Sequence, residues 1–436
     1  MKTFDPKQFE SILGLVLNQK KAEHVVVKAS GMRQGASRFA GSQIVQNVAL
    51  SDLTVEIEAS FGSQVGTAKT NQLDRQSIGA CLARAEEIAR LSPPDPEFLP
   101  PVAPVPLPTL STHVEATARC SPADRAGAIA RALEATASAN LVGSGLLSTT
   151  ENAFAIGNSA GLVAFQRETE ASLSFSASRD ECAGRACGFS RDVRTLDGAG
   201  VARQAVSRAL AAKNPREIPP GRYDVILEPD AVRELIGSFG WMQLNARETA
   251  EGRTALVGKQ GSRVAGPEVE LLSDPQWPGC QVRPFDEEGS LRKPTHWVRG
   301  GVLENLQSSR FWSKKTGAPF VGTPGNLIMK GKDTSLEAMI KSTRRGLLIT
   351  RFWYLNPVDR MRDLYTGTTR DGTLWIENGE VVSGVKNLRF NDSALRVLSS
   401  IESLGRVQTD SSWEGYLVCV PYLKVKDFQF TSVTGF

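Results

Sequence analysis

The sequence predicts an α+β fold, in which an N-terminal mixed α/β region precedes a large, mainly β C-terminal domain. Two observations predict this class. Amphipathic helix patterns and strand patterns follow one another in the first half of the chain, whereas strand patterns dominate the second half. The chain has 436 residues, of which 41% are hydrophobic, so it is long enough for two or three units that each bury a core.

Composition divides the chain into segments. A connector at 92–120 is crowded with prolines, which remove backbone donors and favour extended backbone. Prolines cluster again at 214–221, which predicts a second boundary. We therefore expect an N-terminal α/β module at 1–91, a middle α/β module at 121–213 and a C-terminal mainly β domain at 222–436.

The first module begins with a helix signal. Asp5 and Pro6 predict a helix start, because an aspartate caps the first turn and a proline fits within it. Strict alternation of apolar and polar residues over 53–61 predicts a half-buried strand with one solvent-exposed face. Asp74 is expected to cap a second helix, which ends before Pro93.

In the middle module, Ser121 and Pro122 predict the start of an alanine-rich helix that runs to about Asn140. A last helix is expected over 198–213. Between these helices we expect four short strands, at 141–150, 152–156, 162–166 and 171–177.

The C-terminal domain reads as strands interrupted by three helices, near 230–244, 335–345 and 392–404. Thr334 with Glu337 predicts a capping box, and Gly346 and Gly405 are expected to be left-handed residues at helix ends.

Two tight hairpins are predicted in the same domain. Asn378-Gly379 between apolar runs is a strong signal for a type I′ turn. Residues 295–301 repeat the Thr, Trp and Gly positions of 373–379, which favours a second hairpin of the same kind.

Charge and cysteine usage exclude several classes of protein. The 51 Lys and Arg residues nearly balance 47 Asp and Glu residues, and no basic stripe is present, so specific nucleic-acid binding is not expected. The six cysteines are scattered, which fits a reducing compartment. No stretch has the length and apolarity of a membrane span or signal peptide. We therefore expect a soluble cytoplasmic protein without a membrane partner.

Catalytic motifs are few. His24, His113 and His296 fall in different segments without a second histidine nearby, so a histidine-built zinc site is not expected. The GxSxG pattern at 157–161 lies between two strand patterns and is expected to be a hairpin turn, not a nucleophile elbow. Cys182 and Cys187 lack further ligands beside them.

One group of aromatic and basic residues could contact a peptide or a protein partner, because aromatic rings offer area and arginine binds carboxylates. The other interpretation is sheet core with solvated edges, since strand alternation alone buries every other residue of 348–354. Both interpretations stay open for Arg310, Trp312, Arg351, Trp353 and Tyr354.

Several longer motifs resemble the TldD/PmbA family, metallopeptidases once described as modulators of DNA gyrase. The resemblance spans nearly the whole chain. It is carried by Pro-Phe-Asp-Glu-Glu-Gly at 284–289, Gly-Gly-Val-Leu at 300–303, Gly-Leu-Leu-Ile-Thr-Arg-Phe-Trp at 346–353, Tyr-Thr-Gly-Thr-Thr-Arg-Asp-Gly at 365–372, and Ser-Arg-Phe-Ala at 37–40.

The resemblance also bears on activity. In the TldD branch a helix at the start of the third unit carries a HExxxH motif, and a later cysteine completes the metal site. The corresponding stretch here, 228–240, contains Glu234 but no histidine, and Cys419 lies too close to Pro421 to match that cysteine. The chain is thus nearer the PmbA (TldE) branch, and we expect no catalytic residue and no metal ligand in it.

This resemblance implies a non-catalytic subunit that forms a heterodimer with a HExxxH-bearing, TldD-like paralogue. Zinc is expected in the partner subunit, and the substrates are expected to be small or unfolded peptides. Two alternatives remain open. One is an autonomous peptidase with an unusual site, for example a metal held by Asp286, Glu287 and Glu288. The other is a peptide-binding module without peptidase activity.

Overall fold

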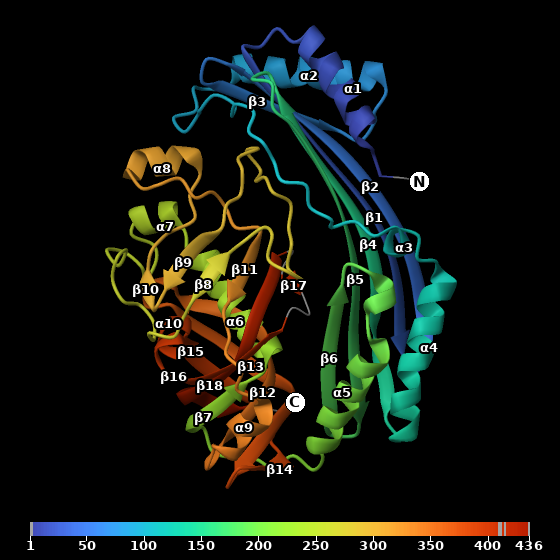
Figure 1. Cartoon of the computed structure of the whole chain (residues 1–436), viewed down its shortest axis with the longest axis vertical. Coiled ribbons are helices and arrows are strands. Elements are labelled where there is room, and N and C mark those ends of the chain that lie inside the picture. Colours follow the sequence, from blue (N-terminus) through green and yellow to red (C-terminus); the bar gives the residue numbers. More distant parts are fainter. Residues whose placement is uncertain (1–2, 409–411, 414–415, 435–436) are drawn as a thin grey trace.

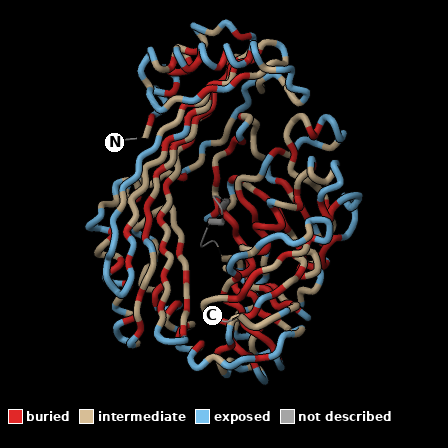
Figure 2. The backbone as a smooth tube through the Cα atoms, turned by 180° about the vertical axis from the view of Figure 1, so that it is seen from behind, coloured by how far each residue is buried: buried red, intermediate tan, exposed pale blue. Residues whose placement is uncertain are grey.

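The computed structural model describes residues 3–408, 412–413 and 416–434, and it confirms the α+β class. A long, curved sheet stands along one side of the molecule and arches over a strand-rich C-terminal domain (Figure 1). Buried residues follow the strands of both parts (Figure 2). Among the described residues, no helix combines the length and apolarity needed to cross a membrane.

The curved sheet is antiparallel throughout, with strand order β3-β2-β1-β4-β5-β6. Its strands therefore come from both sides of the proline-rich connector. The elements of this region are α1 (Pro6–Gln19), β1 (His24–Ala40), β2 (Gln43–Phe61), β3 (Gln64–Thr70), α2 (Arg75–Leu91), α3 (Glu115–Ala118), α4 (Pro122–Ser138), β4 (Val142–Asn158), β5 (Val163–Arg179), β6 (Cys182–Ser190), η1 (Val193–Thr195) and α5 (Gly198–Ala211).

The region consists of two halves with the same order of elements, each a helix, three antiparallel strands and a second helix. The first strands of the two halves, β1 and β4, pair in the middle of the sheet. One core lies between α1, α2 and the first half of the sheet, and another lies between α4, α5 and the second half.

Each outer strand has a glycine where its helix crosses. A Cβ atom on Gly66 in β3 would lie 2.2 Å from the carbonyl oxygen of Ala85 in α2. A Cβ atom on Gly184 in β6 would lie 2.3 Å from the carbonyl oxygen of Ala205 in α5. Backbone atoms cannot yield to such an approach, so both helices dock at distances that only glycine permits.

The C-terminal domain is built on a second sheet, ordered β10-β9-β8-β11-β18-β15-β13-β12-β7, in which β18 also pairs with β7. Its elements are β7 (Gly221–Leu227), α6 (Pro229–Met242), α7 (Ala246–Ala250), β8 (Leu271–Ser273), β9 (Thr295–Arg299), β10 (Val302–Leu303), α8 (Arg310–Thr316), β11 (Asn326–Met329), α9 (Leu336–Lys341), β12 (Arg345–Asp359), η2 (Arg360–Arg362), β13 (Leu364–Glu377), β14 (Glu380–Gly384), β15 (Leu388–Ser393), α10 (Ala394–Ser399), β16 (Ile401–Gln408), β17 (Ser412–Trp413) and β18 (Tyr416–Val433).

The pairing of β18 with β7 closes five strands, β7, β12, β13, β15 and β18, into a ring. Aromatic rings from three of these strands fill its interior. The ring centroid of Phe352 lies 4.4 Å from that of Phe390 and 5.5 Å from that of Phe428. All three side chains are buried, together with apolar residues of α6, in the largest core of the protein.

Several local predictions are confirmed. The side chains of Asp5, Asp74 and Ser121 cap α1, α2 and α4 as expected. Both hairpins form, and both turn residues have positive φ angles in each, 51° and 82° at 378–379, and 53° and 76° at 300–301. Type I′ turns need this backbone conformation.

Other local predictions are wrong. The four short strands of the middle module are two continuous strands, β4 and β5, because the polar residues at the expected breaks remain in the ladder: Glu151 pairs with Thr169. Ser335, not Thr334, caps α9. Gly346 and Gly405 lie within strands β12 and β16, where extended pairing replaces the expected left-handed turn.

We expect Gly66→Ala to lower the free energy of unfolding by roughly 2 kcal/mol or more, because the new methyl group overpacks a backbone contact. Gly14→Ala in α1 is the control, because a Cβ atom there meets nothing within 4 Å and should stabilise the helix by about 0.5–1 kcal/mol. Urea unfolding measures both. Equal stability of the two variants would contradict the proposed close packing.

A second prediction concerns Asp363, at the start of β13. Burial raises the pKa of this carboxyl to about 6. Hydrogen bonds from the amide of Leu395 and the hydroxyl of Ser393 favour its charged form and lower the pKa, but burial outweighs them. A raised pKa in the folded state stabilises the protein below the unfolded pKa, and this contribution is lost as the pH rises through about 6.

We therefore expect the stability of Asp363→Asn relative to the natural protein to increase between pH 4 and pH 7, by up to roughly 3 kcal/mol. Urea unfolding across this pH range measures the difference. Asp333→Asn removes a carboxyl whose side chain is 97% exposed, so burial cannot contribute there. A pH-independent difference at Asp363 would contradict the assignment.

Candidate functional site

The stretch that the resemblance aligns with the metal-binding helix of the TldD branch, 228–240, falls on α6. This helix begins directly after β7, with Pro229 in its first turn. Most of its length is buried in the core of the C-terminal domain, where Val232, Leu235, Ile236 and Phe239 are inaccessible. Near its N-terminal end, charged side chains of the helix meet Arg185 and Arg208 of the curved-sheet region.

A buried ion cluster surrounds this first turn. Asp230 and Arg233 form an ion pair on α6, with Oδ1 and Nη2 2.9 Å apart. Arg208 of α5 forms an ion pair with Glu228, the residue that precedes the helix. Arg185 of β6 adds a longer contact to Asp230, at 3.9 Å. The cluster therefore joins the curved sheet to the C-terminal domain.

The charges of the cluster determine its protonation. Burial alone would raise the pKa of Asp230, but the guanidinium groups of Arg233, Arg208 and Arg185 outweigh burial and lower it. Burial raises the pKa of the Cys187 thiol, and the nearby charge of Asp230 adds to this effect. The carboxylate is thus held ionised and the thiol neutral, so this cysteine is a poor nucleophile and a poor metal ligand.

One member of the cluster, Arg233, falls on the HExxxH motif that the resemblance implies for the TldD branch. When Glu234 is aligned with the glutamate of HExxxH, Arg233 and Ser238 stand at the two histidine positions. Arginine has no acceptor atom and stays protonated, so it cannot ligate a cation. Within the described ranges, no three His, Cys, Asp or Glu residues lie close enough together to hold a metal. Arg233 therefore cannot replace a histidine as a zinc ligand at this position.

The space beside the cluster is small. A cavity of about 30 Å³ lies there, between α5, α6 and β18. That volume suits about one water molecule and not a peptide. Its lining includes Cys187, Arg208, Asp230, Arg233 and Tyr422.

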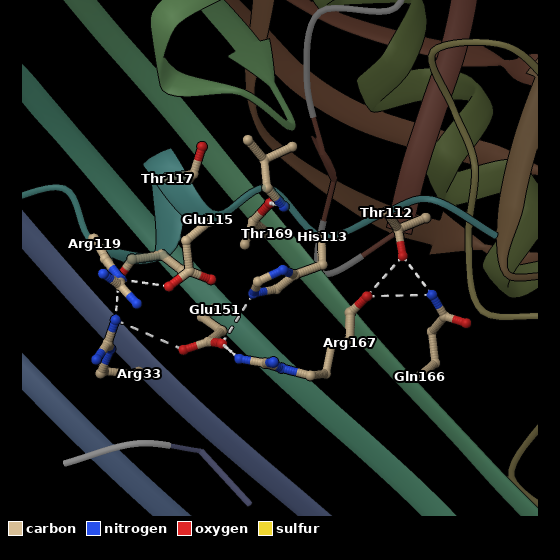
Figure 3. A network of polar contacts seen from close by, with 12 residues as sticks. Arg33, Thr112, His113, Glu115, Thr117, Arg119, Glu151, Gln166, Arg167 and Thr169 are labelled. Atoms are coloured by element: carbon tan, nitrogen blue, oxygen red, sulfur yellow. Dashed lines mark hydrogen bonds and ion pairs between the residues drawn. The ribbon is translucent and has the colours of Figure 1, made fainter. Parts of the chain in front are cut away.

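The three histidines lie in separate places, as predicted. His113 belongs to a network around Glu151, shown in Figure 3. The carboxylate of Glu151 is only 3% exposed and binds Arg33, Arg167 and His113, whose Nε2 lies 3.1 Å away. Burial would raise the pKa of Glu151, but Arg167 and the other partners lower it. The network fastens the connector to β1, β4 and β5.

The remaining histidines have other surroundings. The ring of His24 stacks on Phe98, and Nε2 of His296 lies 3.5 Å from the carboxylate of Glu270. The GxSxG segment is a hairpin turn, as predicted: Ser159 accepts a hydrogen bond from the Val25 amide.

Arg310 and Trp312, on α8, contact the connector. Arg310 donates to the carbonyl oxygen of Pro100 at 2.8 Å. The indole nitrogen of Trp312 donates to Glu97 at 3.1 Å, and this tryptophan is buried. Their contacts are thus with a segment of the same chain.

Arg351, Trp353 and Tyr354 lie elsewhere, on β12, which Figure 1 shows well apart from α8. Arg351 donates to Asp371 at 2.7 Å. Trp353 is 40% exposed beneath the guanidinium of Arg370, and Tyr354 is 73% exposed. The five predicted residues therefore form two groups. Among these five, Trp353 and Tyr354 are the most exposed.

The acidic run at 286–288 has three separate sets of partners. Asp286 accepts hydrogen bonds from the amides of Glu288 and Ser290, which makes a turn. Glu287 pairs with Arg283, and Glu288 pairs with Arg310. Neighbouring carboxylates in this run do not converge on one point.

The ion cluster on α6 was not predicted from the sequence. Its members Arg185, Arg208 and Asp230 are far apart in the chain, and their meeting depends on how the sheet packs. One signal was available. Arg233 stands among apolar residues on a helix that is otherwise core, and a charge in such a place needs a buried partner.

Comparisons with known proteins agree on one family. Residues 220–432 match the PmbA/TldA metallopeptidase C-terminal domain, and residues 117–213 match the central domain of the same family. Metalloprotease PmbA of Escherichia coli O157:H7 is 23% identical over 91% of this chain and 92% of its own length. A metalloprotease of Methanothermobacter thermautotrophicus is 24% identical over 60% of this chain, and the match spans 63% of the archaeal protein.

Solved structures show the same fold. TldE from Thermococcus kodakarensis has a TM-score of 0.85 with 18% identity, and covers 97% of this chain and 100% of its own. A candidate modulator of a DNA gyrase from Thermotoga maritima has a TM-score of 0.87 with 21% identity, and covers 97% of this chain and 100% of its own. The matched domains together span most of the sequence, and the chain belongs to the PmbA/TldD metallopeptidase family.

Proposed function

We propose that this chain is a non-catalytic, TldE-like subunit that assembles with a HExxxH-bearing, TldD-like paralogue into a zinc metallopeptidase for small or unfolded peptides. One observation carries the proposal. Arg233, which is paired with Asp230, and Ser238 stand at the two histidine positions when Glu234 is aligned with the glutamate of HExxxH, in a chain that belongs to a metallopeptidase family.

Electrostatics supports a metal-free role. The cluster combines the guanidinium groups of Arg185, Arg208 and Arg233 with the carboxylates of Glu228 and Asp230. Its excess of positive charge repels a divalent cation. The arginines also satisfy the buried carboxylates, so the helix is stable here without a metal.

Exposed apolar side chains support assembly with a partner. Val45 and Leu50 of β2 and Leu146 of β4 are exposed on the curved sheet. Trp353 and Tyr354 expose aromatic surface on the C-terminal domain. Apolar surface of this kind is typical of protein interfaces, and we assign these two aromatic residues as candidate contacts for the paralogue or for peptide.

Metal content tests the proposal first. Purified alone, this chain is expected to hold far less than one zinc ion, measured by elemental mass spectrometry. Co-expressed with the TldD-like paralogue of its own genome, it should co-purify as a complex with about one zinc per pair. Stoichiometric zinc in the isolated chain would point instead to an autonomous peptidase.

A pair of matched substitutions tests the assignment of roles. In the co-expressed complex, Glu234→Gln in this chain should leave kcat/KM for a peptide substrate within about twofold, because this glutamate has no metal-bound water to activate. The same change at the glutamate of the paralogue's HExxxH motif should lower kcat/KM by roughly 100-fold or more.

Two outcomes would contradict the proposal. Loss of activity in Glu234→Gln equal to that in the paralogue variant would show that this chain takes part in the chemistry. Failure of the chain to bind any HExxxH-bearing paralogue would favour a peptide-binding module without peptidase activity.

A further inference from the structure

A second cavity lies far from α6, where the curved sheet, the connector and the loop before α8 come together. Its volume is about 280 Å³, enough for a small organic molecule. The lining comes from β1, β2, β3 and the connector, together with the loop at 287–288, Ser309 and the start of α8. Figure 1 shows these segments converging at the end of the sheet that α1 and α2 cover.

The lining is predominantly acidic, and most of its carboxylates have partners. Glu287 pairs with Arg283, Glu288 pairs with Arg310, and Glu97 pairs with Arg247 and accepts a hydrogen bond from Trp312.

Glu58 is the exception. It has neither a hydrogen bond nor an ion pair with any residue that the structure describes, although it is half-buried on the cavity face of β2. Asp95 also lines the cavity and adds negative charge, and its carboxylate accepts only the amide of Glu97 among the described contacts. Two cations also line the cavity: Lys28 pairs with Glu56, at 3.4 Å, and its charge also acts on Glu58, whereas Arg310 pairs with Glu288.

A buried hydroxyl beside Glu58 also lacks a partner. Ser60 is 3% exposed, lines the cavity, and its Oγ forms no hydrogen bond within the described part of the chain. It lies on the same face of β2 as Glu58, two residues further along, and pairs across the strands with His24. A buried hydroxyl without a partner is destabilising, and a bound donor would remove that penalty.

Aromatic rings complete the lining. Phe98 stacks on His24 with ring centroids 6.2 Å apart, and Phe311 lies at the α8 side of the cavity. Carboxylates together with aromatic faces favour organic cations. A metal ion is disfavoured, because no three His, Cys, Asp or Glu residues of the described chain are grouped to hold one.

We propose that this cavity binds a primary ammonium group carried on a short alkyl or peptide chain, with Glu58 as its ionic partner and the Ser60 hydroxyl as a further acceptor. The ammonium group donates three hydrogen bonds. The carboxylate of Glu58 and the hydroxyl of Ser60 lie on the same face of β2 and can accept two of them. The inference goes beyond the proposed subunit role and does not depend on it.

Isothermal titration calorimetry of the full chain tests the site with 1,5-diaminopentane and n-butylamine as probes and 1-butanol as the neutral control. Saturable binding of the amines at one site is expected, without comparable binding of the alcohol. Glu58→Gln should weaken binding about tenfold, the loss of one charge-assisted hydrogen bond. Asp333→Asn, which removes a carboxylate from a side chain that is 97% exposed in the C-terminal domain, should change it less than about twofold.

Several outcomes would overturn the proposal: no saturable binding of either amine, equal binding of 1-butanol, or equal weakening by Glu58→Gln and Asp333→Asn. Thermal unfolding midpoints show whether each variant folds. Should Glu58→Gln fail to fold, Ser60→Ala and Phe98→Leu decide, and unchanged affinity in both would overturn the site.

Two further probes separate the sources of the ammonium group. Ala-Ala-amide carries a peptide N-terminus, and N-acetyl-Ala-Ala-amide lacks the charge. Tighter binding of Ala-Ala-amide than of both its acetylated form and the diamine supports a peptide N-terminus as ligand. Tighter binding of the diamine supports a free polyamine.

Discussion

The contact between α5 and α6 is the constraint on which the arrangement of the two halves of the protein depends. Arg208 reaches from α5, the last helix of the curved-sheet region, to Glu228 at the start of α6, and also donates to the carbonyl oxygen of Arg185. Separating the two parts would leave buried charges without partners, which is strongly destabilising. The contact therefore fixes the position of the curved sheet relative to the C-terminal domain. It also determines which charges surround the first turn of α6.

Much of the fold could be predicted because its signals are local. A capping residue such as Asp74 acts on amides within one turn, and a turn such as 378–379 needs only its own two residues. Predictions that required distant partners were wrong, and so were three local ones, at Thr334, Gly346 and Gly405. Glu151 resembled a break between strands because its burial depends on Arg167 and on His113 of the connector.

The candidate site divides in the same way. The absence of histidine from 228–240 and the i,i+3 spacing of Asp230 and Arg233 are visible in the sequence. The approach of Arg208 is not, because it follows from docking α5 against a strand whose glycine, Gly184, admits it closely. The acidic cavity at the opposite end also depends on three distant segments.

The connector is held at both of its ends by side chains of other segments. Arg310 binds Pro100, and the Glu151 network binds His113, whereas residues 103–106 between these anchors are exposed. The two halves of the sheet are thus held together mainly by contacts outside 103–106, and the covalent continuity of this segment contributes little. A chain cut there is expected to behave as two fragments that complement one another, which makes this segment a natural position for a split-protein reporter.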